Sequence, residues 1–223
     1  IDLVIPPLIP HVNVLMGTRG MIRSCISPAA PVAKCVRVTY DSTVLYDDMS
    51  NGGGIACDIE NAIRMNADCM AVQTFIGAPG ESRSLELLSR TADAGARYGI
   101  PTLGVVAVGK QMERTEKFFL LATRVLAENG ANIVKSYYCD GFERVAAACP
   151  VPIVIAGGKK LPELEALEMA YRAIQEGAHG VDMGRNIFQS DCPAGMAQAI
   201  GKVVHEGYTP KQAFEVYETV KNQ

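Results

Sequence analysis

Residues 116–137 read EKFFLLATRVLAENGANIVKSY, and this stretch decides the fold. Its first part has helical periodicity, and four side chains share one face: Phe119, Leu120, Thr123 and Leu126. Gly130 follows, as is typical of the residue just past a helix C-terminus. The chain then continues into a short apolar run that starts at Ile133 and suits a buried strand. The stretch therefore predicts a helix that leads directly into a buried strand.

The same order of helix, glycine and strand occurs twice more along the chain. Residues 84–98 and 164–176 also have helical periodicity, and Gly99 and Gly177 follow them. Seven apolar runs have the length and composition of buried strands: 12–16, 35–39, 69–75, 102–108, 132–137, 152–156 and 180–183. Their spacing leaves room for a return helix in most gaps. Continuous apolar runs without polar alternation indicate parallel strands that are covered on both faces.

Two architectures are built from repeated strand–helix units, an open doubly wound sheet and a closed (β/α)8 barrel. An open sheet favours a Gly-x-Gly-x-x-Gly turn after an early strand, and the sequence has none. The glycines instead follow the last two predicted strands, where barrels commonly bind phosphate. We therefore predict an α/β fold, a (β/α)8 TIM barrel that forms a single domain over residues 1–223. The seven runs are then strands 2–8, and the first strand is expected to be missing from the given chain.

Composition excludes several classes of protein. The chain has 223 residues, of which 48% are hydrophobic and 20% charged, so it can build one sizeable core and is not disordered. With 21 Lys and Arg against 24 Asp and Glu, it has no basic field, and we expect no nucleic-acid and no membrane partner. The seven cysteines form no Cys-x-x-Cys pair and the three histidines stand apart. Buried thiols, a cytoplasmic location and no metal site are therefore expected.

The informative residue is Lys135, because it interrupts a strand that is otherwise apolar. Lys135 shares a strand face with Tyr137, so both side chains are expected to point into the mouth of the barrel. Partial burial there favours the neutral amine, which can attack a carbonyl and form a Schiff base. Lys110, just past the fifth strand, is a second candidate for the substrate pocket. The alternative is a structural role for Lys135, in an ion pair with a carboxylate such as Asp182.

Two glycine-rich turns, IAGGKK after the seventh strand and MGRN after the eighth, suggest a phosphorylated substrate. Glycines let backbone amides approach an anion, a helix start adds positive potential, and an arginine can form charge-assisted bonds to phosphate oxygens. We predict that Gly157, Gly158, Gly184 and Arg185 bind the phosphate of a small keto compound. Tight strand-to-helix turns are the alternative use of these glycines.

On these residues the sequence resembles the Schiff-base aldolases of the deoxyribose-phosphate and archaeal-type fructose-bisphosphate aldolase family. The resemblance covers nearly the whole chain, and its most specific segments are 156–162, AGGKKLP, and 182–190, DMGRNIFQS. It implies that Lys135 is the Schiff-base lysine of a class I aldolase-family lyase or acyltransferase with no bound cofactor. In this family an Asp-His-Gly segment on the first strand lies near the lysine, and the chain begins after it.

Within the family, the sequence is most similar to a thiolase branch that processes autoinducer-2. There the imine would activate the ketone for acetyl transfer to coenzyme A as co-substrate, giving acetyl-CoA and dihydroxyacetone phosphate. The resemblance also implies a homo-oligomer such as a decamer. Two alternatives remain: a class I fructose-bisphosphate-type aldolase, and a barrel that binds a phosphorylated ligand without a Schiff base. The aldolases have an aromatic pair after the fifth strand, where residues 105–108 read VVAV, and this difference favours the thiolase branch.

Overall fold

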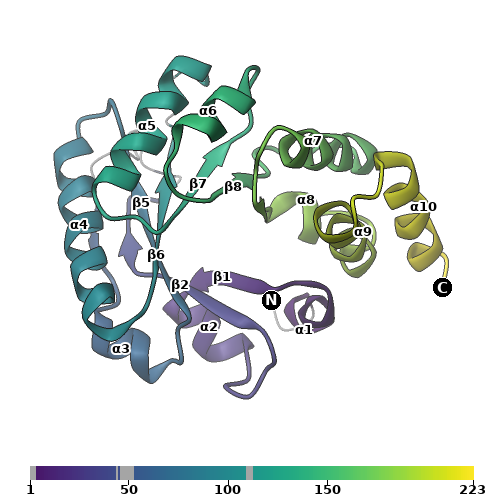
Figure 1. Ribbon diagram of the computed structural model, residues 1–223. Coiled ribbons are helices and arrows are strands. Elements are labelled where there is room, and N and C mark those ends of the chain that lie inside the picture. The colour runs from purple at the N-terminus through teal and green to yellow at the C-terminus, as the bar shows by residue number, and fades with distance from the viewer. Residues whose placement is uncertain (1–3, 44, 46–52, 109–112) are drawn as a thin grey trace.

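The computed structural model describes residues 4–43, 45, 53–108 and 113–223. Seven strands form one curved sheet in the order β1-β2-β5-β6-β7-β8-β9, and every neighbouring pair is parallel (Figure 1). Their bounds are β1 (Val14–Thr18), β2 (Ala33–Arg37), β5 (Cys69–Thr74), β6 (Thr102–Val106), β7 (Ile133–Tyr137), β8 (Ile153–Ala156) and β9 (Gly180–Asp182). Two short strands, β3 (Thr39–Tyr40) and β4 (Gly54–Ile55), pair separately and antiparallel.

Helices follow most of the sheet strands and cover the outer side of the sheet (Figure 1). The chain starts with α1 (Ile5–Leu8) and the 3-10 turn η1 (Ile9–His11). The helices between strands are α2 (Arg19–Cys25), α3 (Ile59–Arg64), α4 (Glu81–Tyr98), α5 (Glu116–Glu128), α6 (Phe142–Ala148) and α7 (Glu163–Gln175). Three more follow β9: α8 (Arg185–Phe188), α9 (Pro193–Glu206) and α10 (Pro210–Lys221). Within the described ranges, no helix is both long and apolar enough to span a membrane.

The predicted barrel strands are confirmed, since each of the seven apolar runs overlaps one strand of the curved sheet. Sequence order along the sheet puts β1 and β9 at its two edges. In an eight-stranded barrel of this topology, the first strand lies between the second and the eighth. In the observed sheet, the corresponding position lies between the two edge strands, β1 and β9. The observed sheet therefore has the order of seven consecutive strands of a (β/α)8 barrel, which is consistent with the predicted strands 2–8.

The glycines after the predicted helices adopt the backbone conformation that the sequence suggested. Gly99, Gly130 and Gly177 have φ angles of 72°, 98° and 104°, a region that side chains other than glycine rarely adopt. The start of α5 has its own signal, because the Thr115 side chain accepts a hydrogen bond from the Phe118 N–H at 3.3 Å. These local signals fix where each helix stops and the next strand begins.

Side chains on β7 alternate between the two sides of the curved sheet. Val134 is fully buried in the large apolar cluster between the sheet and the helices. Ile133 packs in a separate cluster of the inner side, around Cys35, Ala71 and Leu103. Because side chains on a strand alternate, Lys135 and Tyr137 share the inner side with Ile133. The fold thus places Lys135 inside the barrel, near the C-terminal end of its strand.

Candidate active site

Lys135 contacts a carboxylate inside the barrel. Its Nζ lies 2.9 Å from Oδ2 of Asp182, the last residue of β9, and the two side chains are 13% and 25% exposed. Strand β8 lies between them, and its inner residues in register are the apolar Val154 and Ala156. The two charged side chains therefore meet across β8, where a small carbonyl compound can still reach them. This is the ion pair of the structural alternative, and it is also a contact through which Asp182 can accept the proton of Lys135.

The inner side of the sheet carries a buried thiol, Cys35. Cys35 is 2% exposed, and both its hydrogen bond with Cys69 and its burial raise the pKa of its thiol far above the usual range. Cys35 packs in the same inner cluster as Ile133 on β7 and Val154 on β8, the residue in register with Lys135. Neutral surroundings of low polarity strengthen the attraction between amine and carboxylate.

Asn186 joins the two predicted phosphate-binding turns. Its fully buried side chain donates from Nδ2 to the Gly157 carbonyl oxygen at 2.8 Å and accepts the Leu161 N–H on Oδ1 at 2.8 Å. A Cβ on Gly157 would lie 2.9 Å from this Nδ2, so the contact requires glycine. The turns after β8 and β9 thus form one unit at the C-terminal end of the barrel. The sequence motif contained Asn186, but its role depends on a contact between two loops.

The predicted phosphate ligands have unused hydrogen-bond donors. Among the described residues, the backbone N–H groups of Gly158 and Gly184 have no acceptor. Arg185 is exposed and begins α8, which has only 4 residues, so the positive charge comes from Arg185 rather than from an extended helix dipole. Lys160, in contrast, is engaged by Glu163 at 2.7 Å. Amide groups without an acceptor, in the same pair of turns as an arginine that forms no ion pair with any described residue, suit an anion.

Tyr137, predicted to line the pocket, lies between Lys135 and the glycine turn. A Cβ on Gly158 would lie 3.9 Å from Cδ1 of Tyr137, so the ring borders that turn. The guanidinium carbon of Arg114 lies 4.3 Å from the centroid of the Tyr137 ring. Local sequence patterns do not single out Arg114, because its contact with Tyr137 depends on how the segment before α5 lies against β7. Lys110, the other predicted pocket residue, lies outside the described residues.

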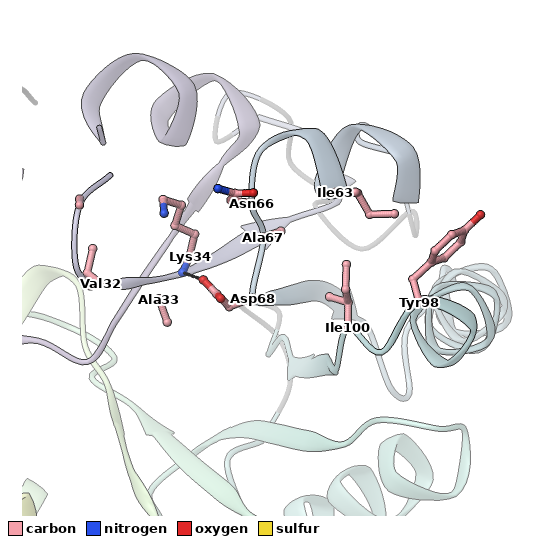
Figure 2. A pocket seen from close by; sticks show the side chains of 10 residues that line it. Val32, Ala33, Lys34, Ile63, Asn66, Ala67, Asp68, Tyr98 and Ile100 are labelled. Carbon is pink, nitrogen blue, oxygen red and sulfur yellow. Dashed lines mark hydrogen bonds between the residues drawn. The ribbon is translucent and has the colours of Figure 1, made fainter. Parts of the chain in front are cut away.

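A cavity of about 580 Å³ lies at the opposite end of the barrel (Figure 2). It is lined by residues at strand starts, among them Lys34 at the beginning of β2, Asp68 before β5 and Ile100 before β6. Lys34 is 5% exposed; its N–H donates to Asp68 at 2.8 Å and its Nζ to the Pro28 carbonyl at 3.4 Å. Barrel enzymes carry their chemistry at the C-terminal ends of the strands. We therefore place the candidate site at Lys135 and not in this cavity.

Comparison with known proteins gives the class of the chain. Residues 11–190 match the profile described as DeoC/LacD family aldolase. The chain belongs to the DeoC/LacD family of aldolases, which confirms the expected class I aldolase-family enzyme.

Individual relatives are similar over nearly the whole chain. It is 50% identical over 218 residues to the 3-hydroxy-5-phosphonooxypentane-2,4-dione thiolase of Photorhabdus laumondii, covering 97% of this chain and 74% of that relative. It is 49% identical over 218 residues to the thiolase of the same name from Escherichia coli K12, with the same 97% and 74% coverage. An uncharacterized aldolase of Pasteurella multocida is 50% identical over 218 residues, again 97% of this chain and 74% of that relative.

Solved structures confirm the fold. An archaeal fructose-1,6-bisphosphate aldolase, with its catalytic Lys covalently bound to the carbinolamine intermediate, superposes with a TM-score of 0.81. It is 21% identical, and the match covers 90% of this chain and 82% of that one. The fructose-bisphosphate aldolase of Slackia heliotrinireducens gives a TM-score of 0.83 at 19% identity, covering 96% of this chain and 76% of its own. At these identities the likeness shows the barrel architecture alone.

The Asn186 contact leads to a first prediction. Asn186→Ala leaves the Leu161 N–H and the Gly157 carbonyl without their partner, so the free energy of unfolding should fall by about 1–3 kcal/mol. Urea denaturation measures this loss. The binding of inorganic phosphate, followed by calorimetry, should weaken as well, because the two turns are no longer held together. Gln189→Ala, on an exposed side chain at the end of α8, is the control and should change neither value. Unchanged phosphate binding in Asn186→Ala would show that the two turns act independently.

Proposed function

We propose that the chain forms a Schiff base through Lys135 with a small phosphorylated keto compound and transfers an acetyl group from it to coenzyme A. The proposed substrate is 3-hydroxy-5-phosphonooxypentane-2,4-dione, and the products are acetyl-CoA and dihydroxyacetone phosphate. The observation that carries this proposal is the 2.9 Å contact between Lys135 and Asp182 at the catalytic end of the barrel. The substrate itself is supported by the relatives of about 50% identity that bear this thiolase name.

In this reaction the glycine turns orient the substrate. The N–H groups of Gly158 and Gly184 and the guanidinium of Arg185 bind the phosphate. Lys135 lies two residues before the end of β7, so its amine projects toward the same end of the barrel as the turns that follow β8 and β9. The carbonyl carbon nearest to the phosphate, C4, is then the one that the amine can attack.

Asp182 moves the proton that the attack requires. Lys135 transfers one proton from its ammonium group to the Asp182 carboxylate and becomes nucleophilic. The amine adds to C4 and forms a carbinolamine. The Asp182 carboxyl then returns its proton to the carbinolamine hydroxyl, which leaves as water. The product is a protonated imine between Nζ and C4.

The imine accepts the electrons of the bond that breaks. The thiolate of coenzyme A adds to C2, the carbonyl carbon of the acetyl group. When the C2–C3 bond breaks, its electron pair moves into an enamine on C3, C4 and Nζ, and acetyl-CoA leaves. Protonation of C3 regenerates the imine, and water hydrolyses it to dihydroxyacetone phosphate and free Lys135. Coenzyme A is consumed in each turnover, so it is a co-substrate.

The test is a product assay with the full chain. With the dione and coenzyme A, we expect acetyl-CoA and dihydroxyacetone phosphate in equal amounts, measured by mass spectrometry and a coupled dehydrogenase assay. Borohydride added with dihydroxyacetone phosphate should reduce the imine and label Lys135. Efficient cleavage of fructose 1,6-bisphosphate without acetyl transfer would instead identify an aldolase. No label on Lys135 would support a barrel that binds a phosphorylated ligand without a Schiff base.

We also propose that the chain assembles as a homo-oligomer such as a decamer and works in the cytoplasm. The family resemblance supports the assembly, and seven cysteines without a disulfide bond suit a reducing compartment. Light scattering coupled to gel filtration measures the assembly. A monomer at micromolar concentration would contradict it.

A further inference from the structure

Arg114 lies over the boundary between Tyr137 and the glycine turn. Its guanidinium carbon is 4.3 Å from the centroid of the Tyr137 ring. A Cβ on Gly158 would lie 3.8 Å from its Nη1. Arg114 comes from the segment before α5, whereas Gly158 follows β8 and Arg185 follows β9. Asn186, which follows Arg185, donates to the Gly157 carbonyl at 2.8 Å, so the turn after β9 also lies close to the turn after β8.

The guanidinium of Arg114 forms no hydrogen bond and no ion pair with any residue that the structure describes. Other arginines nearby in the chain are paired: Arg144 with Glu116 at 2.6 Å and Arg124 with Glu128 at 2.7 Å. Stacking on an aromatic ring uses the flat face of a guanidinium and leaves its N–H edges free. Arg114 thus presents unused donors, held in place by Tyr137, next to the unused N–H of Gly158.

We propose that Arg114 is a phosphate-binding residue, which binds the phosphate of the keto substrate together with Arg185. A phosphate monoester carries about two negative charges at neutral pH, and a single arginine balances only part of that charge. A guanidinium can donate two parallel N–H bonds to phosphate oxygens. The inference rests on the proposed function, because the bound phosphate is that of the Schiff-base substrate.

This arrangement makes Arg114 a residue that selects phosphorylated ketones over unphosphorylated ones. Tyr137, on which Arg114 stacks, lies two residues after Lys135 on the same strand face. A phosphate bound by Arg114 therefore lies at a fixed position relative to the amine. An unphosphorylated ketone has no group for Arg114 to bind, so its reaction with Lys135 should not depend on this residue.

The test compares two ketones in the borohydride trapping of Lys135, dihydroxyacetone phosphate and dihydroxyacetone. For Arg114→Ala, the concentration of dihydroxyacetone phosphate that gives half-maximal labelling should rise about 10- to 100-fold, because a charge-assisted contact is lost. The value for dihydroxyacetone should not change. Arg114→Lys should recover part of the lost affinity, since lysine keeps the positive charge but cannot donate two parallel hydrogen bonds to the phosphate. Arg124→Ala is the matched control, an exposed arginine on α5 paired with Glu128, and should behave as the wild type.

Two results would overturn the inference: the same half-saturation value for dihydroxyacetone phosphate in Arg114→Ala and wild type, or equal losses with both ketones. Calorimetric binding of inorganic phosphate tests Arg114 without the Schiff base, and Arg114→Ala should weaken it at least several-fold. If the wild type gives no label on Lys135, the proposed function fails. The calorimetric titration with inorganic phosphate then tests by itself whether Arg114 binds phosphate.

Discussion

Lys135→Met should abolish acetyl transfer, with kcat lower by at least about 10⁴-fold. Methionine keeps a long unbranched side chain on the inner side of β7, but it has no amine to form the imine. The borohydride label should also disappear, since no other amine contacts Asp182 among the described residues. Acetyl-CoA formation and peptide mass spectrometry measure the two effects. The variant also leaves Asp182 without its cation, so circular dichroism must show that it is folded.

Lys34→Met is the matched control for this experiment. Lys34 is even less exposed than Lys135, but it lies at the other end of the barrel and reaches only a backbone carbonyl. Its replacement should leave kcat within about twofold of the wild type, because surface or structural changes distant from the site leave the chemistry in place. Activity above about 1% of wild type in Lys135→Met, in a folded protein, would make Lys135 a structural ion-pair partner, because a lost nucleophile costs far more.

Asp182→Asn should lower kcat by about 10²–10⁴-fold, because general acid–base catalysis typically contributes that much. Asparagine keeps the shape of the side chain but cannot accept the proton of Lys135. Borohydride trapping should therefore become slower, whereas inorganic phosphate should bind almost as well as before. The difference in labelling rate between Asp182→Asn and the wild type should become smaller as the pH rises, since hydroxide can then take the proton of Lys135 in place of the carboxylate. Rates of labelling measured from neutral to alkaline pH give this profile.

Asp191→Asn is the control for the carboxylate, since Asp191 pairs with Lys221 at 2.8 Å in an exposed contact away from the barrel interior. It should leave both kcat and trapping unchanged. A trapping rate in Asp182→Asn equal to that of the wild type at neutral pH would remove Asp182 from the proton transfer. If Asp182→Asn lost both phosphate binding and borohydride trapping, the ion pair would instead have a structural role.

The strands and their order could be predicted because each is a local apolar run between turn residues. Lys135 stands out in the sequence because it interrupts such a run. Lys34 does not stand out, because the second predicted strand starts at residue 35, whereas the observed strand spans Ala33–Arg37. Its start follows from pairing with β1, in which Val14 lies opposite Ala33, and a single strand does not encode that register.

Contacts between loops could not be predicted from local patterns. Asn186 acts on Gly157 and Leu161, 29 and 25 residues away in the sequence. Arg114 reaches Tyr137 and Gly158 only after the segment before α5 folds over β7. Each of these roles requires that the ends of neighbouring strands lie side by side in the folded barrel. Burial of a lysine is also not enough to identify a catalytic residue, because Lys34 and Lys135 are both largely buried but lie toward different ends of the barrel.

The two hydrogen bonds by which Asn186 joins the turns after β8 and β9 have a consequence for redesign of the enzyme. One amide joins the two turns that are proposed to bind the phosphate, while Lys135, the proposed Schiff-base lysine, lies on β7, which this amide does not contact. Under the proposed function, the two turns that bind the phosphate can therefore be altered through Asn186 without a change on β7 itself. Variants selected for longer or uncharged ketones should accumulate changes around the amide and retain the lysine.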